Sequence, residues 1–141
     1  MSKFSDYLEG KIIETTLRGA AMPAPSSIYI ALYTADPSDA GTSANEVAVA
    51  NWPGYVRQDA AQGAAISTGW TAASNGVSSN AKVVTFPANN GGAPVVVGWL
   101  ALHDAQSGGN MLYHAPLVAS KTLQVGDVLS FGIGALTVTV Q

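Results

Sequence analysis

The second half of the chain constrains the fold most, because residues 82–141 alternate short apolar runs with glycine turns. Its ionised side chains are few: Lys82, Asp104, Lys121 and Asp127. Short runs of this kind, each closed by turn residues, are typical of antiparallel strands. A β-domain so poor in reactive groups is expected to hold something together rather than to transform it.

The whole chain follows the same pattern, with roughly seven to nine short strands separated by turn signals. Residues 27–34 are apolar on both faces, which predicts a central strand, whereas Pro116 predicts an edge or a bulge. We therefore expect one domain, residues 1–141, that is mainly β: an antiparallel β-sandwich or jelly-roll-like domain with one N-terminal α-helix. The predicted strands are 27–34, 82–86, 94–103, 111–118, 123–125, 127–131 and 136–140. Residues 55–66 and 70–73 are predicted to be strands or extended segments.

Residues 3–18 are the helix candidate. Apolar side chains, beginning with Phe4 and Leu8, recur at a spacing of three to four residues. Ser2 or Ser5 is expected to cap the start. A helix of this kind is expected to cover a sheet face or a neighbouring molecule.

The loop at 35–54 is longer than a connector needs, which is typical of a functional segment. Trp52 is predicted to be exposed in it and to contact a partner, whereas Trp99 is predicted to lie in the core. The carboxylates of Asp36, Asp39 and Glu46 fit either a calcium or acid–base site or simple turn residues. The turn interpretation is favoured, because the spacing matches no calcium loop.

His103 and His114 flank the predicted hairpin loop at 104–110, with Asp104 adjacent. They fit either a metal site or residues packed beside aromatic side chains, and packing is favoured because no third ligand has metal-like spacing. The chain also has no cysteine, no phosphate loop and no nucleophile elbow. We expect no catalytic residue, no cofactor, no metal and no enzymatic activity.

The composition limits which kinds of partner are expected. Charged residues make up 11% of the chain, against roughly 25% in an ordinary domain. A surface this neutral suits a protein packed against its own copies or a partner, although a neutral surface can also simply be soluble. The basic residues are scattered singly, so nucleic-acid binding is not expected. Residues 1–18 do not form a signal peptide and no apolar run is long enough for a membrane helix, so neither export nor membrane insertion is expected.

Several segments resemble a family of small tailed-bacteriophage virion proteins commonly labelled tail fibre protein. The likeness spans about residues 3–140. Its carriers are FSDYLE, IYIALYTADPSDA, a Gly-Tyr-x-Arg-Gln element at 54–58, SNAKVVTFP, GWLALHDAQSGGNMLYHAPL and SKTLQVGDVLSFGIGALTVTV. The stretches around Trp52 and Gly69-Trp70 are insertion-like departures from the pattern.

The resemblance implies a virion structural protein made in the bacterial host cytoplasm. One expectation is a capsid cement (decoration) protein on the capsid exterior, which staples neighbouring major capsid proteins. This is favoured because a single globular pattern leaves no room for a fibre shaft and tip. The alternative is a tail-fibre module that binds a host receptor or glycan.

Expected protein contacts come from three places. The helix would contribute Phe4, Tyr7 and Leu8. The long loop would contribute Trp52 and Tyr55 as anchors. Leu112, on an edge strand, would serve self-association as a homodimer or homotrimer.

Overall fold

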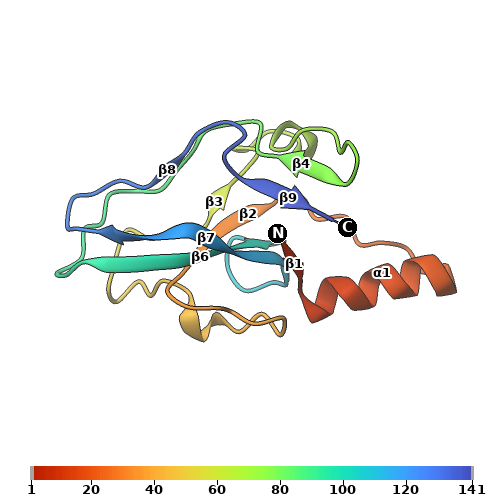
Figure 1. The fold of residues 1–141 in the computed structure, drawn as a ribbon, viewed down its shortest axis with the longest axis horizontal. Coiled ribbons are helices and arrows are strands. Elements are labelled where there is room, and N and C mark those ends of the chain that lie inside the picture. Colours follow the sequence, from red (N-terminus) through yellow and green to blue (C-terminus); the bar gives the residue numbers. More distant parts are fainter. Residues whose placement is uncertain (1, 141) are drawn as a thin grey trace.

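The computed structural model describes residues 2–140 and is a mainly β fold with a single α-helix. A five-stranded antiparallel sheet has the order β1-β7-β6-β2-β3, and two smaller ladders, β4-β9 and β5-β8, lie across one of its faces (Figure 1). The sandwich-like β class with an N-terminal helix is confirmed. The elements are β1 (Lys3–Phe4), α1 (Asp6–Arg18), β2 (Tyr29–Tyr33), β3 (Gln58–Asp59), β4 (Val77–Ser79), β5 (Val84–Thr85), β6 (Val95–His103), β7 (Met111–Leu123), β8 (Ser130–Phe131) and β9 (Thr137–Thr139), with 3-10 turns at Ser43–Asn45 and Ile66–Thr68.

The β6-β7 hairpin is the backbone of the large sheet, and β2 lies between β6 and β3 as its apolar faces predict. Val97 pairs with Lys121, but Trp99, two residues on, pairs with Pro116. Residues 117–120 therefore bulge out of the ladder opposite Gly98. The prediction that Pro116 lies at an edge or a bulge is confirmed.

Apolar side chains fill both sides of this sheet. The main core lies between the large sheet and the two small ladders, because every second residue of a strand points to the same face. A smaller cluster lies on the other face, beneath the loop that follows β2. The main core is built from Ile30, Leu32, Val47, Trp52, Tyr55, Ala60, Val84, Phe86, Val95, Val97, Leu102, Leu123, Leu129 and Leu136.

Helix α1 begins at Asp6, three residues later than predicted. The Ser5 hydroxyl accepts a hydrogen bond from the Leu8 N–H at 3.2 Å, so Ser5 is extended and acts as the cap. The two residues before it form β1, in which Lys3 pairs with His114 and Phe4 with Tyr113. Phe4 is drawn to the sheet because its ring packs edge-on against Tyr113, 5.5 Å between centroids.

Strands predicted at 55–66 and 70–73 are mostly absent. Gln58–Asp59 forms β3 and Trp70 makes an isolated bridge to Asn80, but a turn with positive φ at Gln62 and Gly63 and a 3-10 turn at Ile66–Thr68 interrupt the chain between them. Asn75 and Gly76 both have positive φ and form the turn that precedes β4. Within residues 2–140, no helix has the length and apolar character needed to cross a bilayer.

Candidate binding surfaces and the buried polar cluster

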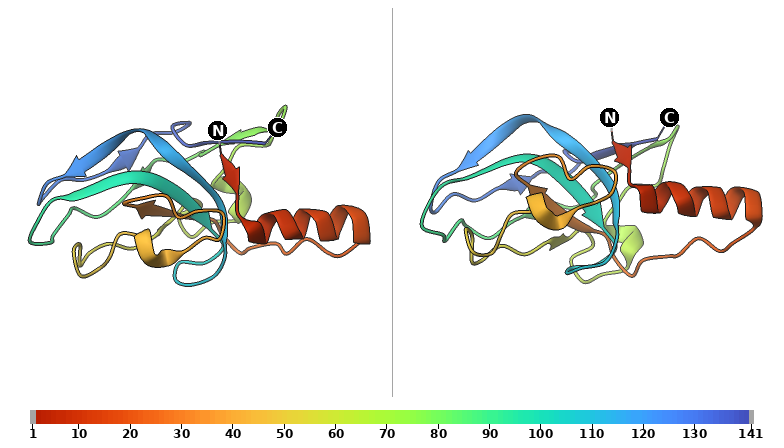
Figure 2. Two further views of the ribbon diagram at one scale, coloured as in Figure 1. Left: turned by 60° about the horizontal axis from the view of Figure 1, so that its bottom comes forward. Right: turned by 90° about the horizontal axis from the view of Figure 1, so that it is seen from below.

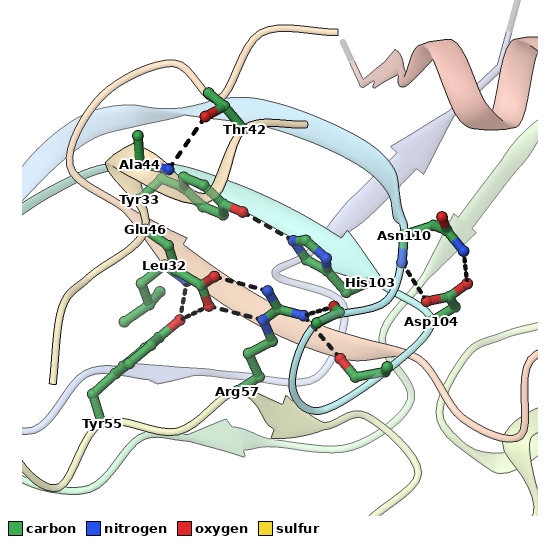
Figure 3. Close-up of polar contacts among 12 residues, drawn as sticks. Leu32, Tyr33, Thr42, Ala44, Glu46, Tyr55, Arg57, His103, Asp104 and Asn110 are labelled. Atoms are coloured by element: carbon green, nitrogen blue, oxygen red, sulfur yellow. Dashed lines mark hydrogen bonds and ion pairs between the residues drawn. The ribbon is translucent and has the colours of Figure 1, made fainter. Parts of the chain in front are cut away.

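The largest polar feature of the interior is an ion pair between Glu46 and Arg57 (Figure 3). Arg57 Nε and Nη2 donate to the two carboxylate oxygens of Glu46, each at 2.8 Å. Glu46 lies within the long loop after β2, and Arg57 lies just before β3. The Arg57 side chain is only 6% exposed, so this bidentate pair joins two segments beneath the surface.

The rest of the guanidinium holds a second loop. Arg57 Nη1 donates to the carbonyl oxygens of Ala105 and Gly108, at 3.0 and 2.8 Å. Both carbonyls lie in the turn between β6 and β7, which Asp104 also closes by accepting hydrogen bonds from Asn110. One side chain thus fixes two loops that are far apart in sequence.

Tyrosine hydroxyls complete the cluster. The Tyr55 hydroxyl donates to Glu46 Oε1 at 3.0 Å and accepts the Leu32 N–H at 2.9 Å. Burial by itself raises the pKa of Glu46, but the hydrogen bonds and charge of Arg57 outweigh it, so that pKa lies below its ordinary value. Burial first, and then the charge of Glu46, raises the pKa of Tyr55 above its ordinary range and that of Tyr33 to about 12.

His103 and His114 do not form a common site. His103 Nε2 lies 3.0 Å from the Tyr33 hydroxyl, and burial followed by the charge of Arg57 lowers the pKa of His103 to about 4. His114 instead stacks on Trp99 and meets Asp39 at 3.0 Å through Nε2. Within residues 2–140 no three histidine, cysteine or acidic side chains are arranged to hold a metal.

The acidic residues of the long loop serve local contacts. Asp36 accepts the Ser38 N–H at 2.9 Å, as the turn interpretation predicts. The Asp39 carboxylate lies 3.0 Å from His114 Nε2. The backbone carbonyl of Asp39 accepts the Asp6 N–H at 2.8 Å, at the start of the helix. These contacts, like the Glu46 cluster, stabilise the fold.

The structure corrects two predictions about tryptophan. Trp52 is fully buried in the main core, and its indole N–H donates to the Ala88 carbonyl at 3.0 Å. Its predicted exposure is therefore wrong, and Tyr55 beside it is likewise 7% exposed and engaged with Glu46. Trp99, predicted to be core, packs against the smaller cluster but is only partly buried, with the Lys3 ammonium 6.0 Å from its ring centroid.

The remaining predicted contact residues lie close together at the base of α1. Leu8 and Leu112 are each 9% exposed and so are largely used within the chain. Phe4 and Tyr7 are partly exposed.

Sequence reasoning missed an open apolar groove of about 550 Å³. Residues of β6 and β7 form the floor of the groove. Residues of β8, β9 and the segment between them form the opposite wall. No sequence signal could have found it, because its walls come from segments as far apart as Ser2, Trp70 and Thr139, which only the fold brings together. Its main apolar lining is Leu100, Tyr113, Leu117, Phe131, Leu136 and Val138.

The buried cluster has its charges paired, and the groove is lined mainly by hydrocarbon, so the geometry favours binding over chemistry. No curated protein matches the chain. A family model described as podophage GP4 fiber I protein gp80 matches residues 3–139. The resemblance to phage virion proteins labelled as fibre proteins is thereby confirmed. The chain belongs to the podophage GP4 fiber I protein family, a fibre-type family of phage virion proteins.

Proposed function

We propose that this protein is a non-enzymatic structural subunit of a phage fibre, which acts by docking onto neighbouring virion proteins. The observation that carries the proposal is the family match, which spans residues 3–139 and so covers the sheet, the helix and the groove together. A fibre subunit needs a rigid body and apolar surface for its neighbours. It does not need a reactive site.

The rigid body is supplied by the Glu46–Arg57 cluster and the sheet. Arg57 ties the loop after β2 to the β6-β7 turn, so the loops at this end are held by charge-assisted hydrogen bonds. The apolar surface is supplied by large side chains left in solvent. Leu17 is 79% exposed, Ile133 69% and Val118 fully exposed. Exposed aliphatic side chains mark interaction sites where they gather in a patch, as Val118 does with the apolar lining of the groove.

A capsid cement role is the second candidate, because the weakly charged surface also suits a protein that coats the outside of the head and staples major capsid proteins. Mass action would then stabilise the assembled shell. The fibre description of the matching family favours the fibre role over this one. A glycan-binding role is not favoured, because it would depend on an exposed Trp52 and this side chain is buried.

The deciding experiment locates the chain in the virion. Purified phage would be disrupted into heads and tails, the fractions separated on a gradient, and this chain quantified against the major capsid and tail proteins by mass spectrometry. The fibre role predicts that the chain sediments with tails, at a small ratio to the capsid protein.

Recovery with heads, at a ratio near one copy per capsid protein, would instead establish the cement role and refute the fibre role. Antibody labelling of intact virions provides the control, because it reports position without disruption. Label confined to tails and label spread over the capsid are mutually exclusive outcomes.

A further inference from the structure

Helix α1 stands away from the body of the protein with one side uncovered. It projects beyond the sheet, and the segment after it runs back toward β2 (Figure 2). Leu8 is the helix residue that is buried against the domain. Leu17 follows it by about two and a half turns and so lies on the opposite side of the helix. Ile13 is 53% exposed beside it, so the uncovered side is apolar.

A helix in this position is not self-sufficient. Its 13 residues are about 20 Å long and near the length at which isolated helices are marginal in water. Gly10, Thr15 and Thr16 within it are weak helix formers. Contact along the uncovered side would stabilise the helix and remove its aliphatic side chains from water.

The groove described above has the complementary character. Its apolar lining is open to solvent, and Val118 stands at its side on the β7 bulge. Lys121 also lines it, and within residues 2–140 no acidic side chain does. Lys121 forms no ion pair in that part of the chain.

The helix supplies both the shape and the charge that the groove lacks. At Gly10 nothing lies within 4 Å of where a Cβ would be, so the uncovered side is flat enough for close approach. Glu9 and Glu14 flank the apolar stripe; Glu14 is paired with Arg18, whereas Glu9 has no ionic partner among residues 2–140. An acidic margin around an aliphatic stripe matches an apolar groove that carries a lysine.

We propose that the uncovered side of α1 (Gly10, Ile13 and Leu17) docks into the groove of a second copy of this chain, with Glu9 or Glu14 facing Lys121. Helix α1 extends away from β7, β8 and β9, whose residues line the groove (Figure 1). It therefore reaches a neighbour's groove and not its own. Helix and groove are different surfaces, so this contact gives a dimer by exchange of arms or a ring where the rotation closes, and a filament where it does not. The inference holds whether the assembly belongs to the tail or to the head.

The absence of cysteine makes the contact open to direct trapping. We would prepare L17C and V118C as separate proteins, both at highly exposed positions, and mix them at about 50 µM, where contacts of micromolar affinity are saturated. Mild oxidation should give a cross-linked pair of twice the 14.4 kDa chain mass in the mixture. Tryptic mapping should find the bond between positions 17 and 118. V128C, at a residue 54% exposed and outside the groove, is the matched control and should not cross-link with L17C.

A second measurement uses mass alone. Untagged wild type should be oligomeric by light scattering, whereas I13D/L17D and V118D/K121E should each run as the 14.4 kDa monomer with unchanged circular dichroism. Mixing the two variants restores one intact helix and one intact groove, and should restore a complex. The proposal is overturned by a monomeric wild type, by a mixture that stays monomeric, or by L17C that cross-links mainly to itself, which would indicate a helix–helix interface.

Discussion

Replacing Arg57 by methionine should be among the most destabilising changes outside the apolar core. The substitution keeps an unbranched stem but deletes four hydrogen bonds, two to Glu46 and two to the carbonyls of Ala105 and Gly108. Glu46 would keep only the Tyr55 hydroxyl as a donor while remaining mostly buried. Removing one partner of a buried ion pair costs about 3–5 kcal/mol, because the other charge is left uncompensated.

That loss is large against a total stability of about 5–15 kcal/mol for a domain. It should appear as a fall in the urea midpoint of more than about 1 M, at the slopes typical of small proteins. Fluorescence of the buried Trp52 is a suitable probe, since it reports entry of water into the core. The double variant E46L/R57M should recover part of the loss, because no charge is then left buried.

The chain provides its own control in Arg18, which pairs with Glu14 at 2.9 Å on the surface, with side chains 72% and 50% exposed. R18M removes the same kind of contact in water and should cost less than about 1 kcal/mol. The reasoning is refuted if R57M unfolds within 1 kcal/mol of wild type, or if R18M costs as much as R57M.

Three further predictions concern the interior. W52A should lower the free energy of unfolding by about 3–5 kcal/mol in urea titrations, and a cost under 1 kcal/mol would mean that Trp52 is not the core residue described. Burial lowers the pKa of His103 from 6.5 to about 4, so the contribution of the neutral side chain to the free energy of unfolding should be fully present above pH 6.5. That free energy should fall by about 3 kcal/mol as the pH drops to 4. H103Q should flatten the fall, and an unchanged slope would contradict the prediction. G91A should destabilise by about 1–3 kcal/mol in thermal melts, because a Cβ there would overlap the Asn51 carbonyl oxygen, whereas G92A, with open space around it, should be neutral.

Local patterns in the sequence carry most of the strand information. The alternation in residues 94–103 predicts β6 to within one residue, and the apolar faces of residues 27–34 place β2 correctly inside the sheet. The helix start was misplaced because Phe4 fits the helical spacing equally well. Only its pairing partner Tyr113, far away in sequence, decides that it joins a strand.

The site features depend on contacts that no local pattern encodes. Asn-Trp-Pro-Gly reads as an exposed turn, yet the ring of Trp52 turns inward because Ala88 offers its carbonyl and Tyr55 and the core offer apolar contact. Glu46 and Arg57 are 11 residues apart, too far for their side chains to meet within one helix or one strand. The groove likewise exists only once β9 has folded over β7.

The contacts of Ser2 bear on how this protein should be engineered. Its hydroxyl donates to the Thr137 carbonyl at 3.3 Å and accepts the Thr139 N–H at 3.4 Å, which brings the two ends of the described chain together. All three residues also line the groove. A purification tag or fluorescent protein fused at either end would emerge at the groove mouth and compete with whatever enters it. Recombinant protein should therefore be freed of its tag before its assembly is measured, whereas a circular permutant that joins the ends with a short linker would leave both helix and groove intact.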